Sequence, residues 1–440
     1  MSPPVDPVPS DDALPPSTGV VVIGGGIVGV STALALAEKG IATVLCEKGV
    51  IGGEQSSRNW GWVRIAQRDP REIALCVESL RIWDGLNEKL GEETGFRRAG
   101  VFYLVDDPAA LAGKEAWLEH ARPYQLDMRL VDGADVARLV PAMTRKVAGG
   151  IWSPADGRAE PQMAAPAIAR GARRLGAKVL TGCAVRGVET TAGKVSAVVT
   201  EKGRVACDAV VLAGGAWSRL FAGNAGIDLP QIRVMSSVMR TEPIDGGFAG
   251  GIGTPDYGIR KRQDGGYNIA RRGNSVYDIV PDTFRQLVRF LPTMKAERNE
   301  RRLRLGRKFL EEMAVPRRWS LDQVTPFERT RILDPAPLMP GLEEARAIVG
   351  RDFPKLAGLR IAQAWGGVID VTPDVVPVIS AVDAHPGFFI ATGFSGHGFG
   401  IGPGAGRLMA DLVAGDRPLV DPHPLRFSRY TDGSRPRPYL

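Results

Sequence analysis

The sequence has few of the side chains that build metal centres and disulfide frameworks, because its 440 residues include only four cysteines and four histidines. Cys46, Cys76, Cys183 and Cys207 show no C-x-x-C spacing, which favours reduced thiols and a cytoplasmic protein over a secreted, disulfide-bonded one. The histidines are scattered along the chain, so no metal site is expected.

Long apolar runs are also missing. No stretch approaches the roughly 20 apolar residues that a membrane-spanning helix needs, so no transmembrane segment is expected. Residues 1–17 are rich in proline and contain no Lys or Arg, which predicts a disordered leader rather than a signal peptide. With 44% hydrophobic residues, the remainder can bury a large core, most simply in two domains.

The net charge of +7 is concentrated in one segment. Residues 285–318 contain 11 Lys or Arg and 4 Asp or Glu. Within this segment, residues 297–313 have helical character, with Leu303, Phe309 and Leu310 on one side. The segment is either a solvated helix with many ion pairs or a docking face for an anionic partner. Aromatic residues do not alternate with the charges, so no nucleic-acid partner is expected.

A glycine-rich turn near the N-terminus is the first motif that indicates chemistry. It comprises an apolar strand at residues 20–23, the glycines Gly24, Gly26 and Gly29, a helix through residue 37, a second strand at residues 42–46, and Glu47. In a dinucleotide-binding unit, the glycines allow a tight turn, close approach to the pyrophosphate and close helix–strand packing, while the acid accepts hydrogen bonds from the ribose. The motif predicts a dinucleotide, and the acid disfavours NADP.

Residues 53–64 (GEQSSRNWGWVR) are too polar for a core strand and too rich in indoles for an ordinary loop. An NAD-binding fold would usually continue with another strand and helix here. Small hydroxyl residues instead suit a longer cofactor: Ser56 and Ser57 could bond phosphate or ribityl oxygens, and Asn59 and the Trp60–Gly61 backbone could face a flavin. The alternative is a surface loop held down by a tryptophan.

Two later segments also favour a flavin. Residues 206–221 (ACDAVVLAGGAWSRLF) predict a buried strand, a Gly-Gly turn and a short helix. Residues 387–413 predict a strand, a glycine-rich loop and a closing helix, with seven glycines between Gly393 and Gly406. Such glycines would let the helix N-terminus approach the flavin, where its dipole stabilises the negative charge of the reduced ring.

These four segments, in this order, resemble the D-amino-acid-oxidase-like family of FAD-dependent amine and amino-acid oxidoreductases, over roughly residues 19–413. The resemblance implies an α/β fold (α+β overall), with a Rossmann-type FAD-binding domain and a second, mostly antiparallel-sheet substrate domain above the flavin. After the leader at residues 1–17, the FAD-binding domain is expected at residues 18–98, 150–225 and 350–440. The substrate domain is expected at residues 99–149 and 226–349.

The resemblance also implies which residues contact FAD, including Val185 at the position of an adenine-contacting backbone. The expected cofactor residues are Gly24, Gly26, Ile27, Val28, Gly29, Glu47, Lys48, Ser56, Ser57, Arg58, Asn59, Trp60, Gly61, Val185, Ala213, Gly214, Gly215, Trp217, Gly393, Ser395, Gly396, His397, Gly398, Phe399 and Gly400.

Several positions depart from the family pattern. Gly367 stands where sarcosine oxidase has a cysteine joined to the flavin, and the histidine attachment of dimethylglycine-dehydrogenase-like relatives would fall near Asn59 and Trp60. FAD is therefore expected to be noncovalent. Ile369 stands at the position of a carboxylate-binding arginine in glycine oxidase, and Gly400 at that of a carboxylate-binding lysine in sarcosine oxidase.

The electron acceptor is a separate question. Asn268 aligns loosely with a family lysine that promotes the reaction with oxygen. The absence of this lysine predicts that the reduced flavin reacts slowly with oxygen, so that a quinone or an electron-carrier protein is the expected acceptor. The basic segment at residues 285–318 could guide an acidic carrier by long-range attraction.

Each candidate for the substrate pocket has a structural alternative to its functional role. Arg64 could bind a substrate carboxylate or form a structural ion pair, His397 could pack against the flavin or act as a base, and Trp365 could be pocket wall or core. Alternation along the expected roof strands would direct some of four further side chains inward: Tyr257, Arg260, Tyr267 and Arg271. No obligate acid–base residue is expected.

The function that the resemblance implies is oxidation of the C–N bond of a primary or secondary amine, or an amino acid, to an imine by hydride transfer to flavin. One alternative is an NAD-linked dehydrogenase, which the C-terminal glycine loop disfavours. The other is a flavoprotein with a mainly binding or RNA-modification role, in which the basic segment would contact RNA.

Overall fold

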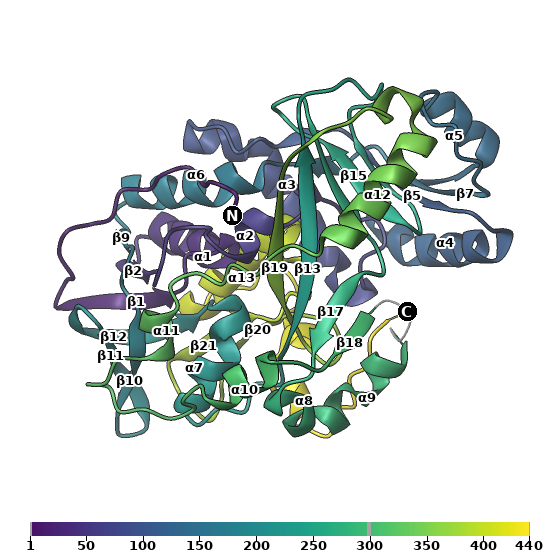
Figure 1. Ribbon diagram of the computed structural model, residues 1–440. Coiled ribbons are helices and arrows are strands. Elements are labelled where there is room, and N and C mark those ends of the chain that lie inside the picture. The colour runs from purple at the N-terminus through teal and green to yellow at the C-terminus, as the bar shows by residue number, and fades with distance from the viewer. Residues whose placement is uncertain (1, 297–300, 440) are drawn as a thin grey trace.

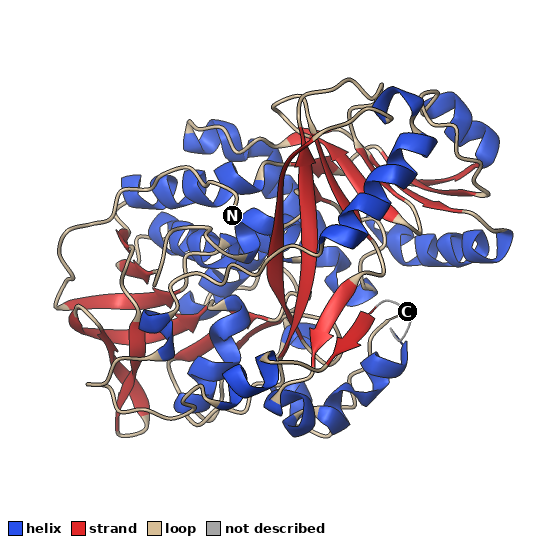
Figure 2. Ribbon diagram, in the orientation of Figure 1, coloured by secondary structure: helices blue, strands red, loops and turns tan. Residues whose placement is uncertain are grey.

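The computed structural model describes residues 2–296 and 301–439. Two large β-sheets organise it, and long helices cover the first sheet (Figures 1 and 2). The expected combination of a Rossmann-type sheet and a mostly antiparallel sheet is confirmed.

The first sheet has the strand order β10-β11-β12-β1-β2-β9, with β21 beside β12 and β20 beside β21. Its strands are β1 (Ser17–Ile23), β2 (Thr43–Cys46), β9 (Lys178–Leu180), β10 (Val185–Thr191), β11 (Lys194–Thr200), β12 (Gly203–Leu212), β20 (Val378–Ala381) and β21 (Phe388–Thr392). Five of these strands, β9, β2, β1, β12 and β21, are parallel to one another. Their apolar side chains are buried, as a parallel sheet covered on both faces requires.

Long helices form a layer on this sheet. Its strands contact α1 (Ile27–Glu38), α6 (Pro161–Arg174) and α13 (Gly398–Ala414), and α3 (Ile73–Leu90) packs on α13 and α6. Helix α1 lies between α6 and α13, and α13 also packs on α3. A Cβ atom on Gly29 would lie 1.9 Å from the carbonyl oxygen of Gly24. Only glycine therefore lets α1 pack this closely on the turn that precedes it.

The second sheet has the strand order β18-β17-β13-β16-β15-β14-β5-β7-β6, with β19 beside β13. Its strands are β5 (Val101–Val105), β6 (Arg129–Asp132), β7 (Gly149–Ser153), β13 (Ile232–Thr241), β14 (Gly251–Gly253), β15 (Tyr257–Lys261), β16 (Tyr267–Arg271), β17 (Ser275–Asp278), β18 (Arg301–Arg304) and β19 (Ile361–Val371). Most neighbouring strands are antiparallel, and helix α12 (Met339–Asp352) packs on the sheet (Figure 1).

The strand β19 differs from its sequence-based assignment. The resemblance placed residues 361–371 with the FAD-binding pieces, but they pair with β13 along their whole length in the second sheet. The same is true of β7, which pairs with β5 and β6. After β19 ends at residue 371, the chain therefore leaves the second sheet and returns to the first, where it forms β20 and β21.

The remaining elements are short. The third sheet contains β3 (Trp62–Val63), β8 (Gly157–Arg158) and β4 (Arg97–Arg98). The other helices are α2 (Gln55–Arg58), α4 (Pro108–Ala121), α5 (Gly133–Leu139), α7 (Ser218–Asn224), α8 (Pro281–Arg285), α9 (Leu287–Ala296), α10 (Lys308–Met313) and α11 (Pro326–Arg329). Six 3-10 turns are η1 (Pro70–Glu72), η2 (Arg122–Tyr124), η3 (Gly215–Trp217), η4 (Pro354–Leu356), η5 (His423–Leu425) and η6 (Phe427–Tyr430).

The N-terminal segment differs from the expected disordered leader, because residues 2–16 lie against the fold. The amide of Asp6 donates to the carbonyl oxygen of Gln162 (3.0 Å), and the amide of Asp11 donates to that of Val179 (2.7 Å). The Asp11 carboxylate also accepts from Arg173 at 3.2 Å. Composition predicted disorder because it gives no information about binding partners elsewhere in the chain.

The basic segment is not a single helix. It contains the end of α8, then α9, β18 and α10, while residues 297–300 of the expected helix lie outside the described residues. Many of its charges are paired, as in Arg289–Asp228 at 2.7 Å and Arg304–Asp278 at 2.6 Å. Leu303 and Leu310 are about 60% exposed, so the apolar side that the helical pattern predicted does not face a core.

The four cysteines are free thiols and are all buried. In the described part of the chain, no helix combines the length and the apolar character needed to cross a membrane. Within the same residues, no three His, Cys, Asp or Glu side chains are grouped so that they could hold a metal ion.

One buried ion pair joins the second sheet to the helical layer. Arg260 on β15 contacts Glu160, which immediately precedes α6, through Nη1–Oε1 at 2.7 Å and Nη2–Oε2 at 3.0 Å. Arg260 Nε also donates to the carbonyl oxygen of Trp60 (2.7 Å), and Glu160 accepts from the amide of Gln263 (2.8 Å). Burial alone would raise the pKa of Glu160, but the Arg260 guanidinium holds it below its ordinary value.

The substitution Arg260→Met should lower the free energy of unfolding by about 3–5 kcal/mol, because it leaves the Glu160 carboxylate buried without its partner. Urea denaturation at pH 7 measures this. The contribution exists above the unfolded-state pKa near 4.5 and is lost as the pH falls through the lower folded-state value. As a control, Arg360→Met breaks an exposed pair with Glu242 and should cost less than about 1 kcal/mol. Equal effects of the two substitutions would contradict the structural role.

Candidate active site

A cavity of about 390 Å³ lies where the two sheets meet. Its walls come from the carboxyl ends of β1, β2 and β12, the start of α1, residues 52–64, the strand β19 and the loop before α13. The carboxyl edge of a parallel sheet is where ligands bind in open α/β folds. The segments that the sequence analysis associated with a dinucleotide therefore line one cavity.

The glycine turn forms the phosphate-binding end of this cavity. Gly24 has a φ of +110°, and a Cβ atom there would lie 2.5 Å from the carbonyl oxygen of Ala213. Gly26 is the N-cap of α1, and the first amide of the helix, from Ile27, donates to Ser56 Oγ at 2.8 Å. The positive end of the α1 dipole thus faces the cavity with a hydroxyl beside it, which suits a phosphate group.

Glu47 is fixed at the end of β2. Its Oε2 accepts from the amide of Gly25 (2.7 Å) and its Oε1 from the amide of Gly49 (2.6 Å). Each carboxylate oxygen keeps a further lone pair that can accept from a ribose hydroxyl. Burial raises the pKa of Glu47. Cys46 and Val185 line the cavity beside it, so this end suits an adenosine.

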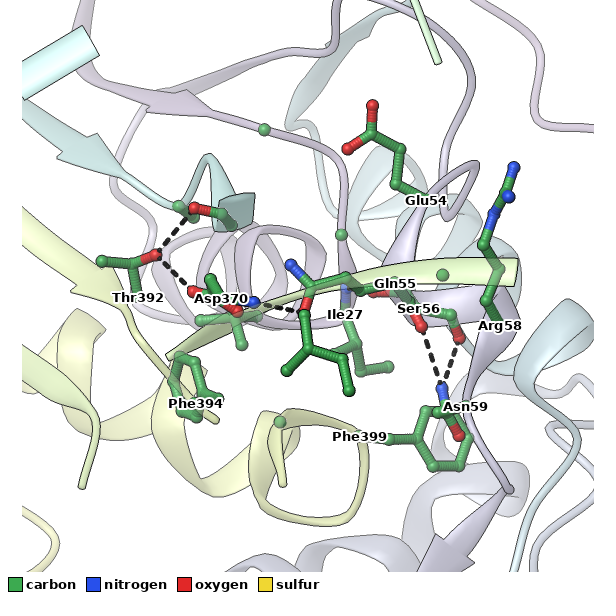
Figure 3. Close-up of a pocket in the computed structure, with 18 of the residues that line it drawn as sticks. Ile27, Glu54, Gln55, Ser56, Arg58, Asn59, Asp370, Thr392, Phe394 and Phe399 are labelled. Carbon is green, nitrogen blue, oxygen red and sulfur yellow. Dashed lines mark hydrogen bonds between the residues drawn. The ribbon is translucent and has the colours of Figure 1, made fainter. Parts of the chain in front are cut away.

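Residues 55–61 make a compact turn around Asn59. Its Nδ2 donates to the carbonyl oxygen of Ser56 (2.9 Å) and its Oδ1 accepts from the amide of Gly61 (2.7 Å), and Figure 3 shows the donor side of this arrangement. The side chains of Asn59 and Trp60 line the cavity. Most of the Asn59 hydrogen-bonding capacity is therefore used to shape the turn.

The loop before α13 closes the opposite wall. Asp370 Oδ2 accepts from Thr392 Oγ1 (3.0 Å) and from the amide of Gly393 (2.6 Å), which anchors β21 to β19 (Figure 3). Residues 396–399 line the cavity, and His397 is the N-cap of α13. The second helix N-terminus at this cavity is therefore that of α13, as the glycine-rich loop predicted.

The structure brings most of the expected cofactor residues into the cavity wall. These are Gly24, Gly26, Ile27, Val28, Glu47, Lys48, Ser56, Arg58, Asn59, Trp60, Val185, Ala213, Gly214, Gly215, Trp217, Gly396, His397, Gly398 and Phe399. The lining does not include Gly29, Ser57, Gly61, Gly393, Ser395 and Gly400.

The residues outside the lining have packing roles. Ser57 is fully buried and donates to the carbonyl oxygen of Glu54 (3.2 Å). Ser395 Oγ donates to the carbonyl oxygen of Gly393 (3.1 Å). A Cβ atom on Gly61 would lie 2.6 Å from the carbonyl oxygen of Ala159, and one on Gly400 would lie 3.1 Å from Val63 Cα. These positions shape the wall without forming its surface.

Of the candidates for the substrate pocket, Arg64 and His397 line the cavity, whereas Tyr257, Tyr267, Arg271 and Trp365 do not. The Tyr257 hydroxyl donates to Asp352 on α12 (2.9 Å), and the Tyr267 hydroxyl donates to the carbonyl oxygen of Phe248 (3.2 Å). Both rings belong to the core between the second sheet and α12.

The other two candidates have structural partners. Arg271 pairs with Asp256 (3.4 Å) and Glu344 (3.1 Å). Trp365 packs in a small apolar cluster and donates its Nε1 to the carbonyl oxygen of Arg58 (3.1 Å). Arg260, also considered for the pocket, is the fully buried partner of Glu160. Alternation along a strand separates the two faces of a sheet but does not tell which face meets the cavity.

Arg68, which no sequence motif indicated, also lines the cavity, near Arg64. Arg68 is only 5% exposed, and its Nε and Nη1 have no hydrogen-bond partner among the described residues. Burial, together with the charge of Arg68, lowers the pKa of Arg64 to about 10. The Arg64 guanidinium carbon lies 4.7 Å from the ring centroid of Tyr103. No local pattern in residues 65–69 could have placed Arg68 here.

His397 faces a buried acid. Its Nδ1 lies 3.5 Å from Glu72 Oε2, and the Glu72 side chain is fully buried. Burial, and then the charge of Arg68, lowers the pKa of His397, so the imidazole is neutral at pH 7.

Asn268, the residue that aligns with an oxygen-activating lysine, is not in the cavity lining. Its Nδ2 donates to the carbonyl oxygen of Trp60 (3.3 Å) and its Oδ1 accepts from Arg262 (3.0 Å). Asn268 and Arg260 thus both donate to the carbonyl oxygen of Trp60 and stabilise the turn there.

The donors and acceptors of the cavity fit FAD. Any Cβ atom at Gly24 would fill the space in the glycine turn. The N-terminus of α1 suits the pyrophosphate, and Glu47 has free acceptor positions for the ribose. Trp62 Nε1 is a buried donor without a partner among the described residues, and it also lines the cavity.

Known proteins resemble the chain over nearly its whole length. The L-amino acid deaminase from Proteus myxofaciens, whose structure was solved in complex with anthranilate, has 33% sequence identity and a TM-score of 0.93, covering 97% of this chain and 96% of that one. The L-amino acid deaminase from Proteus vulgaris has 30% identity and a TM-score of 0.91, covering 96% and 99%. Glycine oxidase from Pseudomonas putida is 26% identical over 417 residues, 93% of this chain and 98% of that one.

The family model described as FAD dependent oxidoreductase (DAO) matches residues 19–412. The match confirms the resemblance and the FAD cofactor expected from the sequence, and it disfavours the NAD-linked alternative. The chain therefore belongs to the DAO family of FAD-dependent oxidoreductases.

Proposed function

We propose that this oxidoreductase oxidises the C–N bond of an amino acid whose carboxylate is bound by Arg64. The observation that supports this most directly is the Arg64 guanidinium: it lines the cavity and has no carboxylate within 4.0 Å among the described residues. Two solved structures that resemble the chain are of L-amino acid deaminases, which agrees with a substrate that carries a carboxylate.

FAD, when bound, accepts a hydride equivalent from the carbon that bears the amine, which gives an imine. The residues of the chain would bind and orient the substrate. Arg64 would hold the carboxylate, with its guanidinium kept in place by the Tyr103 ring and by a hydrogen bond to the carbonyl oxygen of Ala66. Trp62 and Phe399 present apolar surface that would exclude water from the reacting carbon.

His397 would contribute to the protonation state of the amine. Because its pKa is lowered by burial, the neutral imidazole would not repel the substrate amine and could accept a hydrogen bond from it. Hydride transfer needs the neutral amine, so a neutral neighbour is an advantage. No side chain is assigned as an obligate base.

We further propose that FAD is held noncovalently. Gly367 and the turn at residues 59–60 carry no cysteine or histidine that could form an attachment. The buried free thiols agree with a reducing compartment such as the cytoplasm.

The substitution Glu47→Gln should weaken FAD binding about 10- to 100-fold, because an amide NH₂ would replace one of the two oxygens, each of which accepts from a backbone amide. The measurement is the FAD released into the supernatant on acid precipitation, at matched protein concentration. Glu189→Gln is the control, since this carboxylate pairs with exposed Arg204. Yellow colour retained in the acid pellet would contradict noncovalent binding, and equal FAD content in both variants would contradict the role of Glu47.

A second prediction compares amino acids with their decarboxylated amines under anaerobic conditions. Leucine, as either enantiomer, should bleach the flavin spectrum if its side chain is accepted, whereas 3-methylbutylamine should not. Across a panel of such pairs, Arg64→Met should weaken apparent binding of the amino acid about 100-fold through lost charge-assisted hydrogen bonds. Arg64→Lys should weaken it less. Bleaching by the amines alone, unchanged in Arg64→Met, would overturn the proposed carboxylate site.

The reduced enzyme should react slowly with oxygen, and we propose a quinone or electron-carrier protein as the acceptor. Asn268, which aligns with the oxygen-activating lysine, is an uncharged amide outside the cavity lining. Stopped-flow mixing of substrate-reduced enzyme with aerated buffer measures the rate. Reoxidation faster than turnover with an artificial quinone would show the opposite, an oxidase.

A further inference from the structure

Arg64 and Arg68 differ from the other cationic side chains of the cavity. Five Lys or Arg residues line it, and three of them have carboxylate partners: Lys48 with Glu54 (2.8 Å), Arg58 with Asp334 (2.8 Å), and Arg331 with Glu201. Within residues 2–296 and 301–439, no carboxylate lies within 4.0 Å of Arg64 or Arg68. The two are four residues apart in sequence and close enough for the charge of Arg68 to act on Arg64.

Several hydrogen-bond donors at this end of the cavity have no acceptor among the described residues. A guanidinium has five N–H donors. Arg64 uses one donor on the carbonyl oxygen of Ala66. Nε and Nη1 of Arg68 and Nε1 of Trp62 have no partner among the described residues. One substrate carboxylate, bound side-on, can satisfy one guanidinium.

The carboxylates that line the cavity are used elsewhere. Glu47 accepts from two backbone amides, and Asp370 accepts from Thr392 and Gly393. Glu54 accepts from Lys48, the Trp217 indole and the amide of Leu333. None of the three is therefore available to Arg68.

We propose that Arg68 is a second anion-binding residue, so that the preferred substrate is an amino acid with two acidic groups. This inference rests on the proposed function, in which Arg64 binds the α-carboxylate. The second acidic group would be the side-chain carboxylate, bound by Arg68 at a point further from the reacting carbon. The buried, unpartnered donors of Arg68 determine this specificity. An apolar side chain would leave them unsatisfied, and an amide would offer one acceptor oxygen without the negative charge.

The charged groups around Arg68 do not replace such a ligand. Asp69 follows Arg68 in sequence, but its carboxylate pairs with Arg71 at 2.7 Å. Glu72 lies 3.5 Å from His397, and both of its oxygens lack a hydrogen-bond partner among the described residues. Asp156 accepts from the amides of Ile65 and Ala66 (2.8 and 3.1 Å). Lys114, next to Gln67, adds a further positive charge nearby.

The test is a titration of the FAD-loaded enzyme with glutarate and with pentanoate, followed by the flavin difference spectrum. The two probes have the same five-carbon chain and differ by one carboxylate. Glutarate should bind at least about 10-fold more tightly than pentanoate at 0.15 M NaCl. Arg68→Met should remove this preference, and Arg68→Lys, which keeps the charge without the planar fork, should retain part of it.

Lys114→Met is the matched control, because it removes a positive charge near the site from a side chain outside the cavity lining. It should leave the preference for glutarate within about 3-fold of the original value. Equal binding of the two probes by the unmodified enzyme would overturn the proposal without any variant. So would an equal loss of both probes in Arg68→Met, because it would mean that both arginines share one carboxylate.

Anaerobic bleaching by glutamate and by glutamine, which have almost the same shape, separates this inference from the proposed function. Faster bleaching by glutamate supports both. Bleaching by neutral amino acids but not by glutamate or aspartate, in either enantiomer, leaves the proposed function standing and overturns the second anion site. Bleaching by amines alone overturns the proposed function, and the inference falls with it.

Discussion

The buried pair between Arg260 and Glu160 is the constraint on which the geometry of the cavity depends. The Arg260 guanidinium, on β15 of the second sheet, contacts both the Glu160 carboxylate at the start of α6 and the carbonyl oxygen of Trp60. Arg260 thus connects the second sheet to the helical layer and to the turn at residues 55–61. A bidentate pair fixes both the distance and the orientation of the parts that it joins. The position of Trp60 in the cavity wall is consequently fixed by Arg260 and Glu160, which do not line the cavity themselves.

The parts of the site that the sequence predicted are those whose function depends on local geometry. Gly24, Gly26 and Glu47 could be placed because a tight turn, a helix start and a strand end occur within 23 residues. The glycine-rich start of α13 could be recognised for the same reason. The fold class followed from these segments together with the family resemblance, and the family match confirms both.

The parts that could not be predicted depend on contacts between distant segments. Tyr257 and Tyr267 lie on roof strands, as expected, but α12 covers the face to which they point. The strand β19 could not be assigned to the second sheet without its partner β13. Arg68 lies in an irregular segment, where no helical or strand periodicity predicts which way a side chain points. In our proposal, residues 64–68 take the anion-binding role that the resemblance placed at Ile369 and Gly400.

Because all four thiols are buried, their reactivity in the native protein measures local unfolding around each of them. Cys46 ends β2 at the adenosine side, Cys76 lies on α3, and Cys207 lies on β12. A thiol reagent can reach each sulfur only when its surroundings open, so the rate of alkylation at each site gives the local opening free energy of that element. Mass spectrometry of the alkylated peptides would therefore map, without engineered probes, how far ligand binding at the cavity rigidifies the helical layer compared with the parallel sheet.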